Sequence, residues 1–283
     1  MTTPQRSILI TGCSSGIGEC VAHGLAARGW RVFASARRST DVERLSTSGL
    51  EAVVLDLRDS ESIAAALAEV LDRTDGRLDA LFNNGAYGQP GAVEDLSRET
   101  LREQFETNLF GWHELTNRVI PVMRTQGHGR IVQNSSVLGL IALPFRGAYN
   151  ASKFALEGLT DTLRLELQGS GIHVSLVEPG PVLSRFRQNS LAALRTNIDV
   201  EASVHRDKYR GALRRLEKEG PAAPFTLPPE AVLKKVIHAL ESPRPRARYY
   251  VTFPTYLFGT LRRLLPSRWL DRVLLAVSRS ENR

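Results

Sequence analysis

A tyrosine and a lysine four residues apart could carry acid–base chemistry in this chain. From Phe154 onward, Leu156, Leu159, Leu163 and Leu167 recur with a helical period, so Tyr149 and Lys153 are expected on one helix face. A nearby ammonium favours the phenolate and lowers the pKa of a phenol, which otherwise titrates near ~10. A tyrosine tuned in this way could exchange a proton with an alcohol or carbonyl oxygen. The alternative is a solvated helix face without function.

A glycine-rich turn near the N-terminus has the setting of a phosphate-binding site. Residues 7–10 form a short apolar run that predicts a buried strand, and an apolar stripe beginning at Ile17 predicts a helix ending before Gly29. Glycines let a pyrophosphate approach the backbone, and unpaired N–H groups at a helix start attract it. The predicted cofactor-binding residues of this turn are Gly12, Ser14, Ser15, Gly16, Ile17 and Gly18.

The second predicted strand, residues 31–36, ends at Arg37-Arg38. In a dinucleotide-binding fold this strand end faces the adenosine ribose, where an acid selects a free 2′-hydroxyl and an arginine accommodates a 2′-phosphate. Ala36 stands where that acid would be expected, and Arg37 follows it. The sequence therefore favours NADP(H) over NAD. A pair of surface arginines without function is the alternative.

Four further strands are predicted at residues 52–55, 78–82, 130–133 and 173–177, alternating with helices. This alternation predicts an α/β fold, a doubly wound parallel sheet of Rossmann type with helices on both faces. Asp56 and Leu57 follow one strand and are predicted to hold the adenine; Asn83 follows another. A long helix over residues 98–119 carries Leu101, Phe105, Asn108, Trp112, Leu115 and Val119 on one stripe. Asn108 is the polar residue on this stripe. Its amide either finds hydrogen-bond partners nearby or forms part of a proton path.

The chain changes character after Gly180. Residues 1–180 hold 17 Lys and Arg against 21 Asp and Glu, whereas residues 181–283 hold 20 against 9. A helix from Glu230 to Glu241, a strand over residues 248–253 and two short amphipathic helices are predicted, the second with Trp269, Leu270, Val273, Leu274 and Val277 on one face. Such a basic end could contact an anionic membrane surface. The alternatives are a solvated basic surface, and helices that cover only the core or a subunit interface. Nucleic-acid binding is not expected, because the basic residues are not interleaved with stacking aromatics.

Composition excludes several other classes of protein. The 283 residues are 42% hydrophobic and 24% charged, as in an ordinary globular protein. No run of ~20 apolar residues is present, and the first residues do not form a signal peptide, so a cytoplasmic protein is expected. Two cysteines and six histidines lack ligand spacing, which predicts neither a disulfide framework nor a metal site.

Taken together, residues 5–185 resemble the short-chain dehydrogenase/reductase family. The cofactor turn matches Thr11-Gly12, Gly16 and Gly18, and the family's Asn-Asn-Ala-Gly segment matches Asn83-Asn84-Gly85-Ala86 with the last two residues transposed. The resemblance implies catalytic residues at Asn108, Ser136, Tyr149 and Lys153. It also implies cofactor contacts from Asn83, Gly85, Tyr149, Lys153, Pro179, Val182 and Ser184, with Ser184 in place of the usual threonine.

The resemblance implies hydride transfer between a nicotinamide and a carbinol carbon, with Tyr149 as acid/base. Ser136 and Tyr149 would bind the substrate oxygen, Lys153 would lower the pKa of Tyr149, and Asn108 would position a water. The C-terminal end is similar to the steroid, retinol and long-chain aldehyde branch of the family, which implies a hydrophobic alcohol, aldehyde or ketone as substrate.

We therefore expect one domain over residues 1–283, with residues 186–283 forming a substrate-binding lid and C-terminal helices. A homodimer or homotetramer is expected from the resemblance. Two alternatives stay open: a reductase of 3-oxoacyl thioesters, and a module that binds NADP without turnover.

Overall fold

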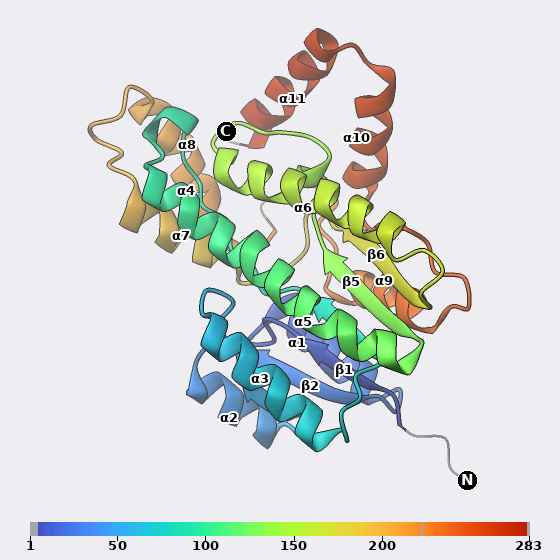
Figure 1. Ribbon diagram of the computed structural model, residues 1–283. Helices are drawn as coiled ribbons and strands as arrows, with labels where there is room; N and C mark the ends of the chain where they lie inside the picture. The colour runs from blue at the N-terminus through green and yellow to red at the C-terminus, as the bar shows by residue number, and fades with distance from the viewer. Residues whose placement is uncertain (1–4, 222, 282–283) are drawn as a thin grey trace.

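The computed structural model describes residues 5–221 and 223–281, and its centre is a sheet of seven parallel strands in the order β3-β2-β1-β4-β5-β6-β7 (Figure 1). The strands are β1 (Ser7–Ile10), β2 (Arg31–Ala36), β3 (Glu51–Val54), β4 (Ala80–Asn83), β5 (Gly129–Asn134), β6 (Ile172–Glu178) and β7 (Arg248–Tyr250). The chain order reverses between β1 and β4, which is where parallel sheets of this type bind their ligands. The predicted doubly wound parallel sheet is confirmed.

Each face of the sheet is covered by its own set of helices. Successive strand residues point to opposite faces, so Ile8 and Ile10 pack into one core while Leu9 packs into the other. The first core is closed by α1 (Gly16–Ala26), α2 (Ser39–Thr47) and α9 (Glu230–Glu241), and the second by α3 (Ser60–Arg73), α5 (Gly111–Gln126) and α6 (Gly147–Glu166). In Figure 1, α3, α5 and α6 lie in front of the sheet.

The predicted strands agree with the structure to within one or two residues, except at the C-terminus. β1 and β2 have the predicted bounds, whereas β7 ends at Tyr250 instead of Phe253. The shortening has a local cause, because Thr252 is the residue before α10 (Phe253–Leu264) and Pro254 occupies the first helical turn. A proline suits that position since its missing N–H needs no partner there.

The long helix predicted over residues 98–119 is interrupted. It consists of α4 (Arg98–Phe105), one π-helical turn η2 (Glu106–Phe110) and α5, which continues to Gln126. The π-helical turn adds one residue to the helical repeat. Residues before the turn therefore no longer share a face with the predicted residues after it. Trp112, Leu115 and Val119 are buried as predicted, but Leu101 is exposed.

The residues after β6 form helices beside and above α6. They are α7 (Phe186–Asn197), α8 (Arg206–Glu217), α10 and α11 (Ser267–Glu281). In Figure 1, α7 and α8 lie near α4, and α10 and α11 project beyond α6. Leu270 and Leu274 of the predicted apolar face are buried, whereas Trp269 of the same predicted face is 61% exposed. In the parts of the chain that the structure describes, none of the helices combines the length and apolar character needed to cross a bilayer.

A glycine at the start of α5 provides a test of the packing. A Cβ on Gly111 would collide with the carbonyl oxygen of Leu57, although its φ of −63° suits any residue. We expect Gly111→Ala to lower the free energy of unfolding by about 1–3 kcal/mol, because backbone cannot move aside cheaply. Gly158 on α6 is exposed with open space around it, so Gly158→Ala should stabilise by up to about 1 kcal/mol. Denaturant unfolding measures both, and equal effects of the two variants would contradict this account.

Candidate active site

The loops at the carboxyl ends of β1, β4 and β6 meet around the predicted phosphate-binding turn. A Cβ on Gly12 would overlap the Cα of Gly85, and one on Gly18 would overlap the carbonyl oxygen of Gly12. Gly12 and Gly16 have φ values of +71° and +63°, which favour glycine. Helix α1 begins at Gly16, so its unpaired first-turn N–H groups, together with the backbone of Ser14 and Ser15, open at this edge. Such a cradle fits a pyrophosphate.

Asn84 fixes the position of this cradle. Its side chain donates to the carbonyl oxygens of Thr11 and Gly12 at 3.0 and 3.2 Å, and it accepts from Asn134 Nδ2 at 2.9 Å. The Thr11 hydroxyl accepts from the backbone N–H groups of Asn84 and Gly85. Asn84 was quoted only as part of a motif, yet it joins β1, β4 and β5. The transposed pair also adopts an ordinary backbone, since neither Gly85 nor Ala86 has a positive φ.

Asn83, predicted to bind the cofactor, has its side chain elsewhere. It is fully buried and donates to the Thr116 hydroxyl of α5 at 3.0 Å. Asn83 and Asn84 are consecutive, so they point to opposite sides of the strand. The side chain of Asn83 therefore holds α5 against the sheet, while that of Asn84 faces the cradle.

The loop after β6 closes the cradle from another side. A Cβ on Gly16 would lie 2.9 Å from the Cβ of Ser184, so Ser184 lies against the start of α1. The Pro179 carbonyl oxygen accepts from Val137 N at 2.8 Å, next to Ser136. Val182 packs on the hydrophobic core, so its contribution to a ligand would come from the backbone.

Basic groups gather where β2 and β3 end. Burial would raise the pKa of the Asp56 carboxyl, but hydrogen bonds from Arg58 and the charges of Arg58 and Arg37 outweigh it, so the pKa is lowered. Arg38 is committed to Asp41 at 2.7 Å, whereas Arg37 makes no ion pair within 4 Å to any residue that the structure describes. Leu57 lies against Gly85, between this region and the cradle. Arg37 is thus available to an anionic group.

Ser136 and Tyr149 are brought together from β5 and α6. Their hydroxyls form a hydrogen bond, and Ser136 Oγ also accepts from Leu138 N at 3.1 Å, which fixes the serine at the start of the short turn η3 (Val137–Gly139). The Tyr149 ring meets the edge of Phe186 with centroids 5.2 Å apart. The sequence did not single out Phe186, because an isolated aromatic residue in a charged segment carries no pattern.

Lys153 is buried one helical turn after Tyr149. Its ammonium donates to the carbonyl oxygen of Asn134 at 2.8 Å and lies 4.2 Å from the centroid of the Trp112 ring and 5.7 Å from that of Tyr149. The predicted juxtaposition of phenol and ammonium is present. The partners Asn134 and Trp112 come from β5 and α5 and were not predicted.

The pKa values of Tyr149 and Lys153 in the protein without coenzyme differ from the expectation. Burial raises the pKa of Tyr149 to about 12, and the hydrogen bond from Ser136 only partly opposes it. Burial also lowers the pKa of Lys153 to about 7, opposed by the charge of Glu157. Desolvation therefore dominates both pKa values, and the lowered tyrosine pKa was not found. At neutral pH the phenol carries its proton.

Asn108 lies in the π turn and is fully buried. Its Nδ2 donates to the Tyr87 carbonyl oxygen at 2.9 Å and to Ser152 Oγ at 3.3 Å, and its Oδ1 accepts from Tyr87 N at 3.2 Å. These contacts correspond to local satisfaction of the amide. They also connect Asn108 to α6 beside Lys153, because Ser152 Oγ donates in turn to the Tyr149 carbonyl oxygen.

An apolar wall adjoins Tyr149. Leu138, Ile141 and Leu143 pack against Phe258 of α10 and against α11, and Tyr149 is packed against the same cluster. The C-terminal helices thus cover the apolar loop that follows Ser136. One side of the phenol meets polar and charged groups, while the other meets hydrocarbon.

This arrangement can hold a dinucleotide along the strand ends and present a proton donor beside it. The cradle would take the pyrophosphate, and the loop after β6 together with Lys153 would take the nicotinamide end. Both regions lie on the same edge of the sheet, at the carboxyl ends of its strands. This location was predicted from the motifs that follow the strands in the sequence.

Comparisons with known proteins agree with this geometry. The family model "short chain dehydrogenase" matches residues 6–195. The chain is 46% identical over 270 residues to the uncharacterized oxidoreductase YbbO of Escherichia coli K12, covering 95% of this chain and 94% of that protein. It is 34% identical to human 17-beta-hydroxysteroid dehydrogenase type 1, covering 87% and 77%, and 30% identical to the NADPH-dependent 3-dehydrocapnine reductase of Ornithobacterium rhinotracheale, covering 95% and 96%.

Among solved structures, a short-chain dehydrogenase from Streptomyces avermitilis superposes with a TM-score of 0.76 and 30% identity, covering 99% of this chain and 97% of that one. Fold, cradle and family match therefore agree, and the chain belongs to the short-chain dehydrogenase/reductase family of nicotinamide-binding oxidoreductases.

Proposed function

We propose that the protein is an NADP(H)-dependent oxidoreductase that interconverts a hydrophobic alcohol with its aldehyde or ketone. The observation that carries the proposal is the Ser136–Tyr149 hydrogen bond next to Lys153, on the strand edge that holds the cradle. When bound, the nicotinamide supplies or accepts the hydride. The protein would supply the binding site, the orientation and the proton.

Tyr149 would act as the acid in the reductive direction. Its phenol is protonated at neutral pH, so it can give its proton to the developing alkoxide oxygen while Ser136 holds that oxygen by a hydrogen bond. The ammonium of Lys153 would stabilise the phenolate that remains. In the oxidative direction the same groups act in reverse, with the phenolate taking the proton of the alcohol.

The substrate class rests on the apolar wall beside Tyr149. Leu138, Ile141, Leu143 and Phe258 are buried in an apolar cluster against which Tyr149 packs, so the surroundings of the phenol on that side are hydrocarbon. One relative is named as a hydroxysteroid dehydrogenase, and another as an NADPH-dependent 3-dehydrocapnine reductase. These features support a hydrophobic ketone over a small polar one.

Replacement of the proposed acid tests the function. Tyr149→Phe should lower kcat by about 10²–10⁴-fold, because general acid–base catalysis contributes that much, while NADPH binding persists. NADPH oxidation would be followed with steroids, retinoids, fatty aldehydes, small ketones and carrier-linked 3-oxoacyl thioesters. Tyr256→Phe, at an exposed position of α10, is the control. Turnover in Tyr149→Phe equal to the wild type would refute the acid role, and NADPH binding without turnover of any substrate would favour a sensing module.

Cofactor choice is tested at the end of β2. Arg37→Asp should weaken NADPH binding by roughly tenfold or more, the effect of losing a hydrogen bond to a charged group, and should leave NADH binding nearly unchanged. Arg38→Asp is the matched control, since Arg38 is already paired with Asp41. Titration of intrinsic fluorescence gives both dissociation constants. An equal loss for NADH and NADPH would contradict the assignment of Arg37 to a 2′-phosphate.

We further propose that α10 contacts an anionic lipid surface. Its outer face carries Phe253, Tyr256, Leu257 and Leu264 in helical spacing, and all four are exposed. Residues 253–281 hold five arginines against two carboxylates, which favours anionic lipid over neutral lipid. A hydrophobic substrate dissolved in that lipid would then be near the apolar wall.

Sedimentation with lipid vesicles tests this contact. The protein should bind phosphatidylcholine vesicles containing phosphatidylglycerol more strongly than pure phosphatidylcholine, and the double variant Phe253→Ser/Leu264→Ser should lose most of that binding. Val204→Ser, at an exposed apolar position near α8, is the control. Binding that is unaffected by the double variant would show that α10 is not the lipid-contacting face, and self-association through α10 in ultracentrifugation would identify a second copy as its partner instead.

A further inference from the structure

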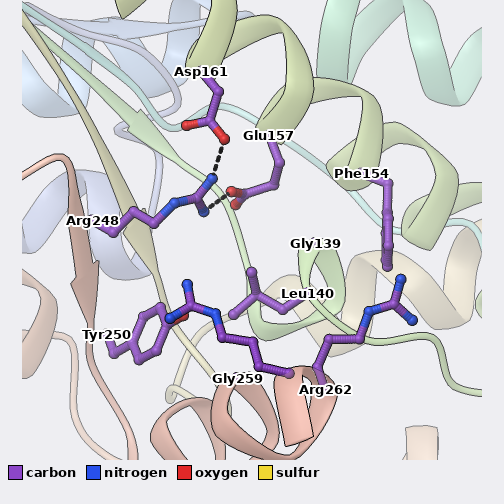
Figure 2. A pocket seen from close by; sticks show the side chains of 10 residues that line it. Gly139, Leu140, Phe154, Glu157, Asp161, Arg248, Tyr250, Gly259 and Arg262 are labelled. Carbon is purple, nitrogen blue, oxygen red and sulfur yellow. Dashed lines mark hydrogen bonds and ion pairs between the residues drawn. The ribbon is translucent and has the colours of Figure 1, made fainter. Parts of the chain in front are cut away.

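A cavity of about 340 Å³ lies between α6, β7 and α10, next to the helix that carries Tyr149 and Lys153 (Figure 2). Its polar walls are formed by Glu157 and Asp161 of α6, Arg248 and Tyr250 of β7, and Arg262 and Arg263 of α10. The proposed hydride transfer uses none of these groups. The cavity nevertheless shares one wall residue, Glu157, with the surroundings of Lys153.

Arg248 is at the centre of a cluster of three carboxylates. It donates to Glu157, to Glu178 at 2.6 Å and to Asp161 at 2.5 Å, and Figure 2 shows its guanidinium between Glu157 and Asp161. Glu157 and Glu178 are buried, with Glu178 fully so. Each carboxylate comes from a segment 70–91 residues away in sequence from Arg248. Burial of so many charges is stable only when they balance.

The three carboxyls around Arg248 are not equally buried. Glu157 and Glu178 are buried, whereas the Asp161 side chain is 38% exposed. Burial, together with the charge of Glu157, raises the pKa of Glu178 to about 8 and so favours its protonated form. Burial would also raise the pKa of Asp161, but Arg164 and Arg248 outweigh it and lower that pKa. Glu157 and Asp161 both form ion pairs with Arg248, and these favour the ionised carboxylates.

Of the three carboxylates, Glu157 is the one that follows Lys153 by four residues on α6. It lies one helical turn further along α6, and its charge opposes the effect of burial on the ammonium. Burial raises the pKa of Glu157 itself, and the ion pair with Arg248 opposes that shift. The hydrogen-bond acceptor of the ammonium is the Asn134 carbonyl oxygen at the end of β5.

We propose that Glu157 is a positioning residue that keeps Lys153 protonated, and that Arg248 holds Glu157 in the ionised state this requires. This inference rests on the proposed function, because it concerns the lysine of that site. The titratable and charged groups facing the pair are Tyr149 and Asp161 of α6, Glu178 of β6, Arg248 and Tyr250 of β7, and Arg262 and Arg263 of α10.

The charge of Lys153 can be measured without any turnover. Lys153 is one of five lysines, with Lys208, Lys218, Lys234 and Lys235, so the ¹³Cε signals of labelled lysine can be followed by NMR, assigned with Lys153→Arg. In wild-type protein without coenzyme, Lys153 should titrate near pH 7. Glu157→Gln should lower this pKa by about 1 unit or more, the effect of losing an opposite charge nearby.

Asp161→Asn is the matched control, because it also removes a carboxylate from Arg248 but leaves the one beside Lys153. In this variant the pKa of Lys153 should be unchanged or slightly raised, since Asp161 raises the pKa of Glu157 and its removal favours ionised Glu157. An unchanged titration of Lys153 in Glu157→Gln, or equal shifts in the two variants, would overturn the proposal. Should Glu157→Gln fail to fold, Glu157→Asp keeps the charge at a greater distance and should give a smaller shift in the same direction.

Activity provides a second readout. If the reaction needs the ammonium, kcat/KM falls as pH rises through the pKa of Lys153, so this alkaline limb should move to lower pH in Glu157→Gln and stay in place in Asp161→Asn. The two failures are distinguishable: a shifted NMR titration without turnover would refute only the proposed function, whereas turnover with an unmoved titration would refute only the role of Glu157.

Discussion

The ammonium of Lys153 is buried, and the packing around it follows from the need to stabilise that charge. An isolated buried cation is costly, so it must find partners or lose its proton. The Lys153 ammonium contacts two other elements, through the Asn134 carbonyl oxygen at the end of β5 and the Trp112 ring on α5, and Glu157 lies one turn further along α6. Helix α6 can therefore occupy one position relative to the sheet and α5, and this position also brings Tyr149 to Ser136.

The same constraint extends to β7. Glu157 is itself buried, so it needs a cation, and Arg248 provides one while also neutralising Asp161 and contacting Glu178. Through this arginine the short edge strand β7 is fixed to β6 and α6. Helix α10, which packs on the apolar loop after Ser136, begins three residues after β7. The ion cluster thus positions both the charged and the apolar side of the site.

Local patterns in the sequence predicted the frame of the site, and long-range contacts account for what they missed. Buried apolar runs identified the strands, and the glycine turn needed only its flanking strand and helix. Helix α2 was missed because Leu45 is its one buried residue among mostly polar neighbours. The amino-acid types of residues 106–110 do not indicate the π-helical turn. Asn83 and Asn84 could not be assigned to opposite faces without the end of β4, and Arg248 finds Glu157 across 91 residues of sequence.

The two sides of Tyr149 explain why burial dominates its chemistry. Hydrocarbon from the loop after Ser136 and from α10 removes water, which raises the pKa of the phenol and lowers that of Lys153. Both shifts favour neutral forms, so a charge appearing nearby changes the state of the pair more than it would in water. A developing alkoxide held by Ser136 is such a charge. The low polarity that opposes ionisation in the resting protein thereby strengthens the attraction between Lys153 and a tyrosine that has given up its proton.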